Sequence, residues 1–293
     1  MNILVTGSSG FFGNVIVHVL KSNSIFTLNR KCGNFQYDLS KSNPDFNTYF
    51  NIVIHNAGKA HSIPKNEIER NKFFEVNVIG TENLLKGIAS VGVPKQFVFI
   101  SSVAVYGKEN GVNIIENEKL NAKDPYGLSK IQAENLILDW CQKNNVICTI
   151  LRLPLLVGKN PPGNLGSMIK AIQKGYYFNV GGGKAKKSMV LAEDVARFIP
   201  VIAPIGGIYN LTDGVHPSFY QISSAIAKNR IANLPLPIVK IIAKVGDLLG
   251  TKAPLNSLKV KKMTSDLTFD DSKAREMGWK PQPVLEYLKH NDL

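Results

Sequence analysis

Cysteine is scarce in this chain of 293 residues, which carries only Cys32, Cys141 and Cys148 and no Cys-x-x-Cys pair. A disulfide framework or a cysteine-based zinc site needs more cysteines at paired spacing, so we expect neither, and no metal. Few cysteines are typical of a protein from a reducing compartment. No basic segment followed by an apolar run stands before the first motif, as a cleaved signal would. The sequence therefore predicts a cytoplasmic location.

Negative charge is also in short supply, with 22 acidic residues against 35 lysines and arginines and a net charge of +13. The lysines are scattered apart from two denser runs, at 184–187 and 259–262, and no nucleic-acid-reading motif accompanies them. We therefore expect no nucleic-acid partner. Three interpretations of the charge stay open: a solvated surface, attraction of anionic ligands, and weak contact with an anionic membrane surface.

The chain lacks a long uninterrupted apolar run, an internal repeat and a low-complexity tract. Its most apolar segment, 231–249, is interrupted by prolines and by Lys240, Lys244 and Asp247, so no transmembrane span is predicted. An amphipathic helix that covers a binding region is the favoured interpretation of this segment, with contact at a membrane surface as the alternative. With 44% hydrophobic residues the chain can nevertheless build a substantial core.

Glycines stand where a dinucleotide-binding turn requires them. Asn2–Thr6 is a short apolar strand, glycines follow at positions 7, 10 and 13, and an apolar helix continues. Gly7 permits the tight turn, Gly10 lets the backbone approach a pyrophosphate, and Gly13 lets the helix pack on the sheet. The free N–H groups of the helix then attract phosphates. This pattern predicts NAD or NADP on a Rossmann-type, doubly wound parallel α/β sheet.

The second predicted strand, Ser24–Asn29, ends without the acid that holds the ribose 2′-hydroxyl of NAD. Asn29 and Arg30 stand there instead, and an arginine can pair with the 2′-phosphate of NADP. The sequence thus favours NADP and leaves NAD open. A third strand is expected over Phe35–Leu39, where Asp38 would accept a hydrogen bond from the adenine amine.

Two further predicted strands bring polar groups to the same sheet edge. Asn51–His55 is followed by the small stretch 56–58, which would lie along the adenosine half of the cofactor. We expect His55 to be a buried structural histidine, and Asn77, on a helix over 67–91, to bond to backbone. Gln96–Ile100 delivers Ser101 and Ser102 to the edge where parallel sheets bind ligands.

A catalytic pair follows a helix start at Asp124-Pro125. Tyr126 and Lys130 are four residues apart and share one helix face. A phenol has a pKa of about 10, and lowering it by about three units requires roughly 4 kcal/mol of preferential stabilisation of the phenolate. We expect the lysine, a cationic nicotinamide and the positive helix end to lower the pKa of Tyr126.

This ordered set of motifs resembles the extended short-chain dehydrogenase/reductases, in particular the NAD-dependent epimerase/dehydratase family acting on nucleotide sugars. The motifs that carry the resemblance are 6–13, 55–58, 77–81, 101–107, 126–130, 151–154, 192–196 and 273–281. The resemblance implies that Tyr126 is the general acid/base, Lys130 its partner and Ser102 the hydroxyl that orients the substrate oxygen. It also places Asn164 and Leu165 near a diphosphate, and Lys187 where relatives often carry an arginine.

The complete predicted site has three parts. The catalytic residues are Ser102, Tyr126 and Lys130. The cofactor-binding residues are Gly7, Ser9, Gly10, Phe11, Phe12, Gly13, Asn29, Arg30, Asp38, Leu39, Asn56, Ala57, Gly58, Asn77, Tyr126, Lys130 and Pro154. The substrate-binding residues are His61, Ser102, Val103, Tyr126, Asn164, Leu165 and Lys187. Residues 1–157 are expected to form the dinucleotide domain, with a strand near 207–211 rejoining it, and 158–293 mainly the substrate region.

Two departures from the family pattern reduce the number of reactions that the chain could catalyse. Sugar dehydratases of this group carry Asp-Glu after the catalytic serine or threonine, whereas Val103-Ala104 here cannot move protons. The missing acid on the second strand weakens the inference of permanently held NAD and favours exchange of NADP(H). We rank a nucleotide-sugar 4-epimerase first and an NADPH-dependent 4-keto-sugar reductase second, ahead of a non-catalytic dinucleotide sensor. A homodimer is expected.

Overall fold

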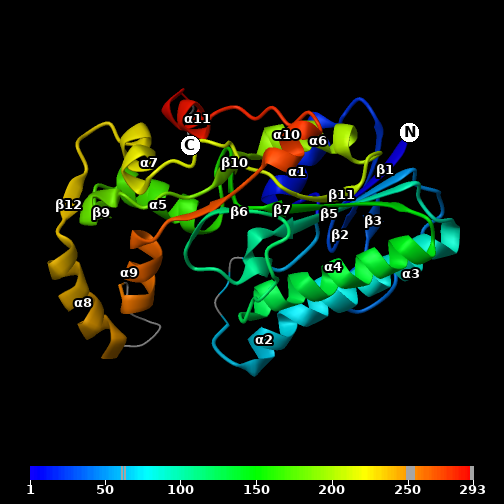
Figure 1. The fold of residues 1–293 in the computed structure, drawn as a ribbon. Coiled ribbons are helices and arrows are strands. Elements are labelled where there is room, and N and C mark those ends of the chain that lie inside the picture. Colours follow the sequence, from blue (N-terminus) through cyan, green and yellow to red (C-terminus); the bar gives the residue numbers. More distant parts are fainter. Residues whose placement is uncertain (61, 63, 249–254, 291–293) are drawn as a thin grey trace.

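The computed structural model describes residues 1–60, 62, 64–248 and 255–290. Its central feature is a parallel sheet with the strand order β11-β7-β5-β4-β1-β2-β3 (Figure 1). The strands are β1 Asn2–Thr6, β2 Ser24–Asn29, β3 Phe35–Gln36, β4 Ile52–His55, β5 Gln96–Ser102, β7 Ile147–Leu153 and β11 Gly207–Asn210. The order reverses between β1 and β4, where doubly wound sheets bind ligands. The predicted Rossmann-type fold is confirmed.

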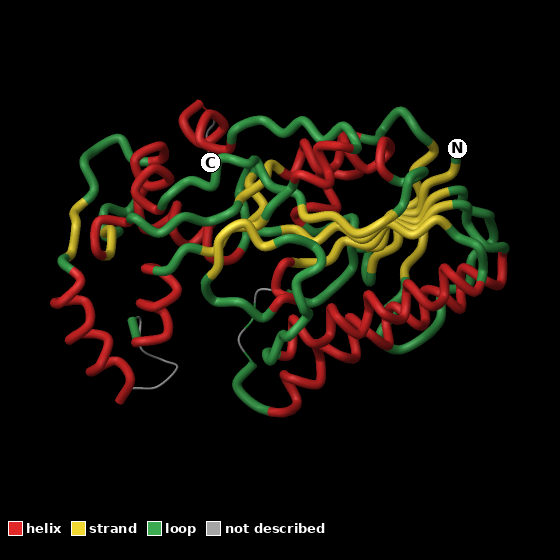
Figure 2. Tube along the Cα trace, viewed as in Figure 1, coloured by secondary structure: helices red, strands yellow, loops and turns green. Residues whose placement is uncertain are grey.

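Helices cover both faces of this sheet, as Figure 2 shows. On one face lie α1 Phe11–Val19, α6 Ala192–Ile202 and α10 Ser272–Glu276, and on the other lie α2 Glu67–Phe74, α3 Gly80–Val91 and α4 Pro125–Lys143. Side chains of β1 alternate between the two cores, with Ile3 and Val5 in one and Leu4 in the other. Burial on both faces explains why these strands are continuously apolar in sequence.

Two predicted elements of the dinucleotide domain differ from those observed. The third strand stops at Gln36 rather than Leu39, because Asp38 turns the chain: its Oδ1 accepts hydrogen bonds from the backbone N–H and hydroxyl of Ser40, at 3.2 and 2.7 Å. The helix predicted over 67–91 contains a π-helical segment, η1 Glu75–Ile79, between α2 and α3. Such π segments occur often at functional sites, and this one carries Asn77.

The remaining elements form a smaller lobe and its connections to the sheet. They are η2 Val103–Tyr106, β6 Gly111–Ile114, β8 Leu155–Val157, α5 Gly163–Gln173, β9 Phe178–Val180, η3 Gly181–Gly183, β10 Met189–Leu191, α7 Phe219–Ile226, β12 Ala232–Leu234, α8 Leu236–Leu248, α9 Ser257–Thr264, β13 Leu267–Phe269 and α11 Val284–His290. Three parallel pairs, β8–β10, β9–β12 and β6–β13, were not expected, since strands of three or four residues carry too little periodicity. Within 231–249 a strand precedes the helix, and residue 249 lies outside the described residues.

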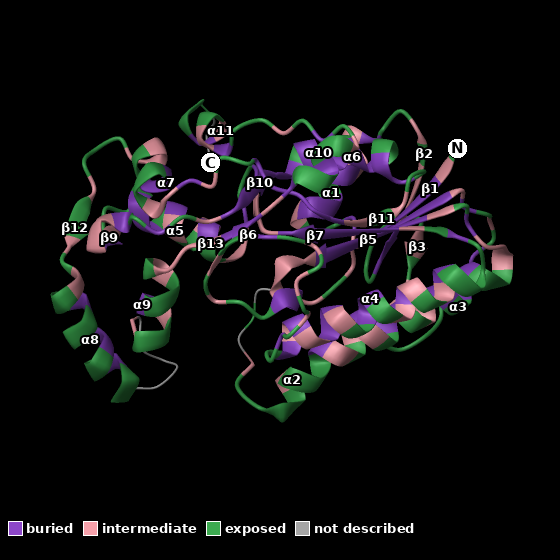
Figure 3. Cartoon of the chain, in the orientation of Figure 1, coloured by how far each residue is buried: buried purple, intermediate pink, exposed green. Residues whose placement is uncertain are grey.

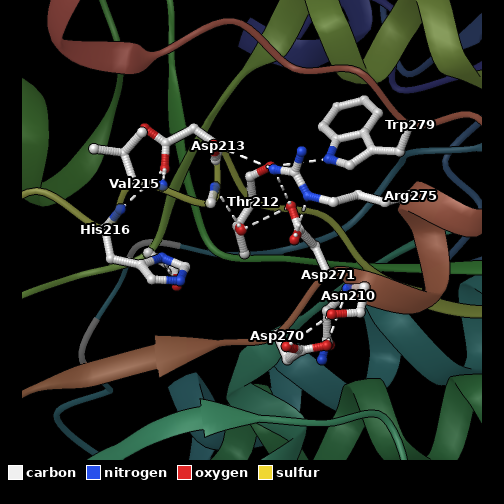
Figure 4. Close-up of polar contacts among 12 residues, drawn as sticks. Asn210, Thr212, Asp213, Val215, His216, Asp270, Asp271, Arg275 and Trp279 are labelled. Atoms are coloured by element: carbon white, nitrogen blue, oxygen red, sulfur yellow. Dashed lines mark hydrogen bonds and ion pairs between the residues drawn. The ribbon is translucent and has the colours of Figure 1, made fainter.

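A polar cluster after β11 fastens the C-terminal segment to the sheet (Figure 4). Thr212 donates its hydroxyl to Asp271 at 3.1 Å, and Arg275 Nε donates to the same carboxylate at 2.9 Å. The indole of Trp279 donates to the Thr212 carbonyl at 2.9 Å. Asp213 Oδ2 accepts a hydrogen bond from a backbone N–H of the same C-terminal segment at 3.2 Å. Asp213 and Asp271 therefore hold the C-terminal segment against the chain that follows β11.

His55 is the structural histidine that the sequence predicts. The Thr81 hydroxyl donates to the Asn77 carbonyl at 2.7 Å, so it accepts a hydrogen bond from His55 Nε2 at 2.9 Å. Thr6, which also accepts from the backbone N–H of Ala57, is hydrogen-bonded to His55 Nδ1 at 2.8 Å. Each ring nitrogen thus has a buried hydroxyl partner. Complete burial, with a smaller contribution from Lys130, lowers the pKa of His55 to about 3.

This lowered pKa predicts a pH-dependent stability. Between pH 6.5 and about 3, His55 binds a proton in the unfolded chain but not in the folded one. The free energy of unfolding should therefore fall with falling pH, by about 1.4 kcal/mol per pH unit from this residue. Urea unfolding at several pH values should show a shallower slope for His55→Asn than for the wild type. Equal slopes would contradict the assignment, and the exposed His18→Asn serves as the control.

Candidate active site

The glycine turn after β1 is built for close approach. Gly7 has φ +66°, and a Cβ on it would lie 2.8 Å from the Cα of Ala57. A Cβ on Gly13 would lie 2.1 Å from the Gly7 carbonyl oxygen, so α1 packs directly on the turn. Helix α1 has no side-chain cap at Gly10 and no acid in its first turn. Its first N–H groups, which include those of Phe11 and the residues after it, are available to a pyrophosphate.

Asn29 holds the glycine turn from the end of β2. Its side-chain oxygen accepts hydrogen bonds from the backbone N–H and hydroxyl of Ser9, at 3.0 and 3.1 Å, and its amide donates to Ser8 at 2.7 Å. Asn29 is buried, whereas the next residue, Arg30, is exposed. The structure thus brings two predicted cofactor residues beside the turn but gives them different surroundings. Asn29 shapes the turn, and Arg30 is accessible to a charged group there.

Arg30 sets the expected cofactor preference. Replacing it by alanine should weaken NADP binding by about tenfold or more, because a charge-assisted contact with the 2′-phosphate is lost. NAD, which has no such phosphate, should bind within about twofold of its original affinity. Calorimetric titration of both dinucleotides measures the difference, with the nearby exposed Lys31→Ala as the control. Equal weakening of both cofactors would contradict a role in selecting NADP.

Asn77 joins the loop after β4 to helix α4. Its side-chain oxygen accepts from the Lys59 N–H at 2.6 Å, and its amide donates to the Lys59 carbonyl at 3.1 Å and to Ser129 at 2.9 Å. The backbone bonding expected for this buried residue is confirmed. A Cβ on Gly58 would lie 3.2 Å from the Asn77 amide oxygen and 3.5 Å from Lys130 Nζ. Three predicted cofactor residues from separate elements therefore meet here.

The Ser102 hydroxyl lies close enough to Tyr126 to favour its phenolate. Ser102 ends β5 and Tyr126 lies in the first turn of α4, whose start is capped by Asp124 through a 3.0 Å bond to the N–H of Gly127. In the protein alone, burial raises the pKa of Tyr126 above its ordinary value, the bond from Ser102 opposes this, and Asp124 raises it further. The expected lowering includes the charge of a bound nicotinamide, so it stays a prediction for the cofactor-bound protein.

The surroundings of Lys130 explain part of the raised pKa of Tyr126. Its ammonium donates to the carbonyl of Ile100 at 2.8 Å and lies 4.4 Å from the ring centre of Phe99. Burial lowers the pKa of Lys130 to about 8, while Glu134 acts in the opposite direction. The cation is thus held at the edge of β5, beside Gly58, by groups other than the phenol. The ammonium therefore loses its proton at a lower pH than an ordinary lysine does.

A buried ionic network behind the pair was not anticipated from sequence. Glu134, four residues beyond Lys130 on α4, accepts a hydrogen bond from Ser101 and pairs with Arg152 at 2.8 Å. Arg152 also donates to the hydroxyl of Tyr106 at 3.1 Å. The regular spacing of Tyr126, Lys130 and Glu134 on one helix face is the sequence signal that could have revealed this carboxylate. The network fixes the ends of β5 and β7 against the middle of α4.

The other predicted site residues have mixed surroundings. Phe12, Leu39 and Leu165 are buried in the hydrophobic cores, so their side chains support the site and only their backbone is available to a ligand. Half-buried and exposed positions are taken by Phe11, Asp38, Asn56, Val103, Pro154 and Asn164. Lys187 Nζ donates to the carbonyl of Ser265 at 2.9 Å, and burial lowers its pKa. His61 lies outside the described residues.

A Rossmann-type sheet with an open glycine turn and a Tyr-x-x-x-Lys pair at its carboxyl edge defines a dinucleotide-dependent enzyme of the short-chain dehydrogenase/reductase class. The chain belongs to the NAD dependent epimerase/dehydratase family, whose model matches residues 3–211. The predicted family membership is confirmed.

Relatives span nearly the whole chain. An N-acetyl-alpha-D-glucosaminyl-diphospho-ditrans,octacis-undecaprenol 4-epimerase from Escherichia coli O157:H7 is 28% identical, covering 95% of this chain and 90% of the relative. A UDP-glucose 4-epimerase from Vibrio cholerae is 29% identical, covering 97% and 92%. Among solved structures, UDP-glucose 4-epimerase from Thermotoga maritima, with UDP-glucose, matches at TM-score 0.74 and 21% identity, covering 99% and 96%. RMD from Pseudomonas aeruginosa, with NADPH, matches at TM-score 0.74 and 20% identity, covering 98% and 96%.

Proposed function

We propose that the protein is a 4-epimerase of diphosphate-activated hexoses that uses NAD or NADP. The observation that carries this proposal is that Ser102 and Tyr126 come together at the carboxyl edge of the sheet, with Lys130 one turn along α4. Relatives of nearly full length bear the name 4-epimerase. The uncapped start of α1 and the tight contact of Gly7 with Ala57 fit a dinucleotide pyrophosphate.

Tyr126 is the proposed proton carrier. In the first half of the reaction its phenolate takes the proton of the C4 hydroxyl, while Ser102 donates a hydrogen bond that positions the substrate oxygen. When bound, the nicotinamide accepts the hydride from C4 and gives it back. Tyr126 then returns its proton to the C4 oxygen as the opposite face of the 4-ketone is reduced. Lys130 favours the phenolate by its charge and holds ribose hydroxyls.

Dehydration is a poor fit to the same site. Val103 and Ala104 follow Ser102 directly, in the turn η2, and Val103 packs beside the apolar cluster around Val105 and Tyr106. Neither side chain carries a proton that could be moved to or from C5 or C6. The chemistry is therefore confined to C4.

A 4-keto-sugar reductase is the second candidate. Arg30, exposed beside the glycine turn, favours NADPH, and a protein of the same fold was solved with NADPH bound. A reductase exchanges its cofactor after each turnover, whereas an epimerase keeps it until the hydride has returned. Epimerisation without added cofactor therefore separates the two.

The test is a panel of sugar diphosphates incubated with purified protein and no added dinucleotide. We include UDP-glucose, UDP-N-acetylglucosamine and N-acetylglucosaminyl diphosphoundecaprenol, because relatives differ in their carrier. Chromatography should reveal the C4 epimer of at least one of them. Turnover only of a 4-keto sugar, and only with NADPH, would replace the epimerase by the reductase. The cytoplasmic location and the homodimer stay predictions.

A further inference from the structure

Helix α8 presents an apolar stripe away from the molecule. Its outward residues are between 46% and 88% exposed and comprise Ile238, Ile241, Ile242, Val245 and Leu248. Figure 3 shows α8 and α9 at the end of the smaller lobe, with exposed residues along both helices. Contiguous exposed apolar side chains of this kind mark interaction sites. Within the described part of the chain, no helix is long and apolar enough to cross a membrane.

The opposite side of α8 is firmly seated. Val239 and Ala243 are buried in a cluster with Val180 of β9 and Val260 of α9. Asp247, near the end of the helix, accepts hydrogen bonds from the backbone and hydroxyl of Ser257 at the start of α9, at 2.9 and 2.5 Å. The helix is therefore packed on one face and open on the other, rather than detached.

Lysines flank the apolar stripe. Lys240 and Lys244 are exposed on one side of α8, and Lys261 and Lys262 are exposed on the neighbouring α9. The two lysines of α9 lie 3.2 and 4.0 Å from Glu109, which offsets only part of their charge. An apolar stripe bordered by lysines is the pattern of helices that lie in the interface of an anionic bilayer, with lysines reaching lipid phosphates.

We propose that the α8–α9 surface, meaning the apolar stripe of α8 and the lysines at 240, 244, 261 and 262, docks on an anionic phospholipid bilayer. Charge complementarity selects this occupant, because the surface is basic and the whole chain carries a net charge of +13. A second copy is a poorer occupant. A two-fold contact joins the same patch on both subunits and would bring two sets of these lysines into one interface.

The docking surface is joined directly to the proposed substrate side. Helix α9 ends at Thr264, and the next residue, Ser265, accepts the hydrogen bond from Lys187. A docked protein would thus have Lys187, a predicted substrate-binding residue, hydrogen-bonded to the residue that follows the docking helix. Docking itself does not depend on the proposed epimerase activity and is measured without substrate.

Flotation with vesicles tests the proposal. The full chain should float with phosphatidylglycerol–phosphatidylcholine vesicles and remain behind with pure phosphatidylcholine. Salt at about 0.5 M should lower the fraction bound, because it screens the attraction between lysines and lipid phosphates. Lys240→Glu/Lys244→Glu and, separately, Ile241→Gln/Val245→Gln should each lower the fraction bound by about tenfold. Lys21→Glu/Lys95→Glu, exposed on the dinucleotide domain with the same charge change, is the control.

The possible outcomes are distinct. Binding that is lost in both α8 variants and kept in the control supports docking, provided the variants keep the wild-type circular dichroism and unfolding midpoint. No binding by the wild type, or equal binding by all variants, overturns the proposal. Conversion of a dimer to a monomer by Ile241→Gln/Val245→Gln, with no vesicle binding, would assign the surface to a second copy instead. None of these results bears on epimerase turnover, which the sugar panel measures.

Discussion

Tyr126→Phe is expected to lower kcat by about a thousandfold, since a positioned acid or base contributes typically 10²–10⁴ in rate. The substitution removes only the phenolic oxygen, so the start of α4 and its cap at Asp124 should remain. Dinucleotide affinity should change little. Steady-state kinetics on the substrate identified by the panel, together with dinucleotide titration, measures both quantities.

A matched control separates chemistry from packing. Tyr176 is 64% exposed in the smaller lobe, so Tyr176→Phe removes the same atom away from the sheet edge and should leave kcat unchanged. If Tyr126→Phe retained turnover within a few-fold of the wild type, the phenol would not be the proton carrier. Ser102→Ala should raise the pH needed for activity, because the bond that favours the phenolate is lost.

Glu134→Gln is expected to destabilise the protein by about 3–5 kcal/mol, the usual cost of leaving one partner of a buried ion pair uncompensated. Arg152 and Glu134 are 4% and 1% exposed, and Glu134 also accepts a hydrogen bond from Ser101. Urea unfolding measures the change. Glu118→Gln is the control, because its pair with Lys108 is more exposed and should be worth less than about 1 kcal/mol.

The same variant has a second, kinetic readout. Glu134 raises the pKa of Lys130 against the effect of burial, so its neutralisation should lower that pKa further below about 8. Lys130 would then lose its proton at a lower pH, and the alkaline limb of the kcat/KM profile should also move to lower pH. A destabilised variant with an unchanged profile would assign Glu134 to stability alone, without a part in positioning Lys130.

The parts of the fold that carry strong periodicity or special residues could be predicted from sequence. Apolar runs define the strands of the main sheet, and Gly7 and Gly13 stand where any Cβ would collide with backbone. The resemblance to a family then supplied roles that spacing alone leaves open. The smaller lobe was harder to predict from sequence, because its paired strands are three or four residues long and depend on partners distant in the chain.

The electrostatic state of the site could not be predicted from spacing. Tyr126 and Lys130 share a helix face, which favours a lowered phenol pKa, but burial acts in the opposite direction and prevails. Lys130 instead bonds to the carbonyl of Ile100, a contact set by tertiary packing. Asn29 likewise occupies the position of a cofactor ligand yet bonds to Ser8 and Ser9.

The fate of the hydrogen on C4 tests the central claim most directly. The substrate is prepared with deuterium at C4 and converted in the presence of excess unlabelled dinucleotide, and the product is analysed by mass spectrometry and NMR. If one bound dinucleotide takes and returns the hydride while Tyr126 carries the proton, the epimer should keep all of its deuterium at C4. Loss of the label to solvent or to the free dinucleotide would contradict the account.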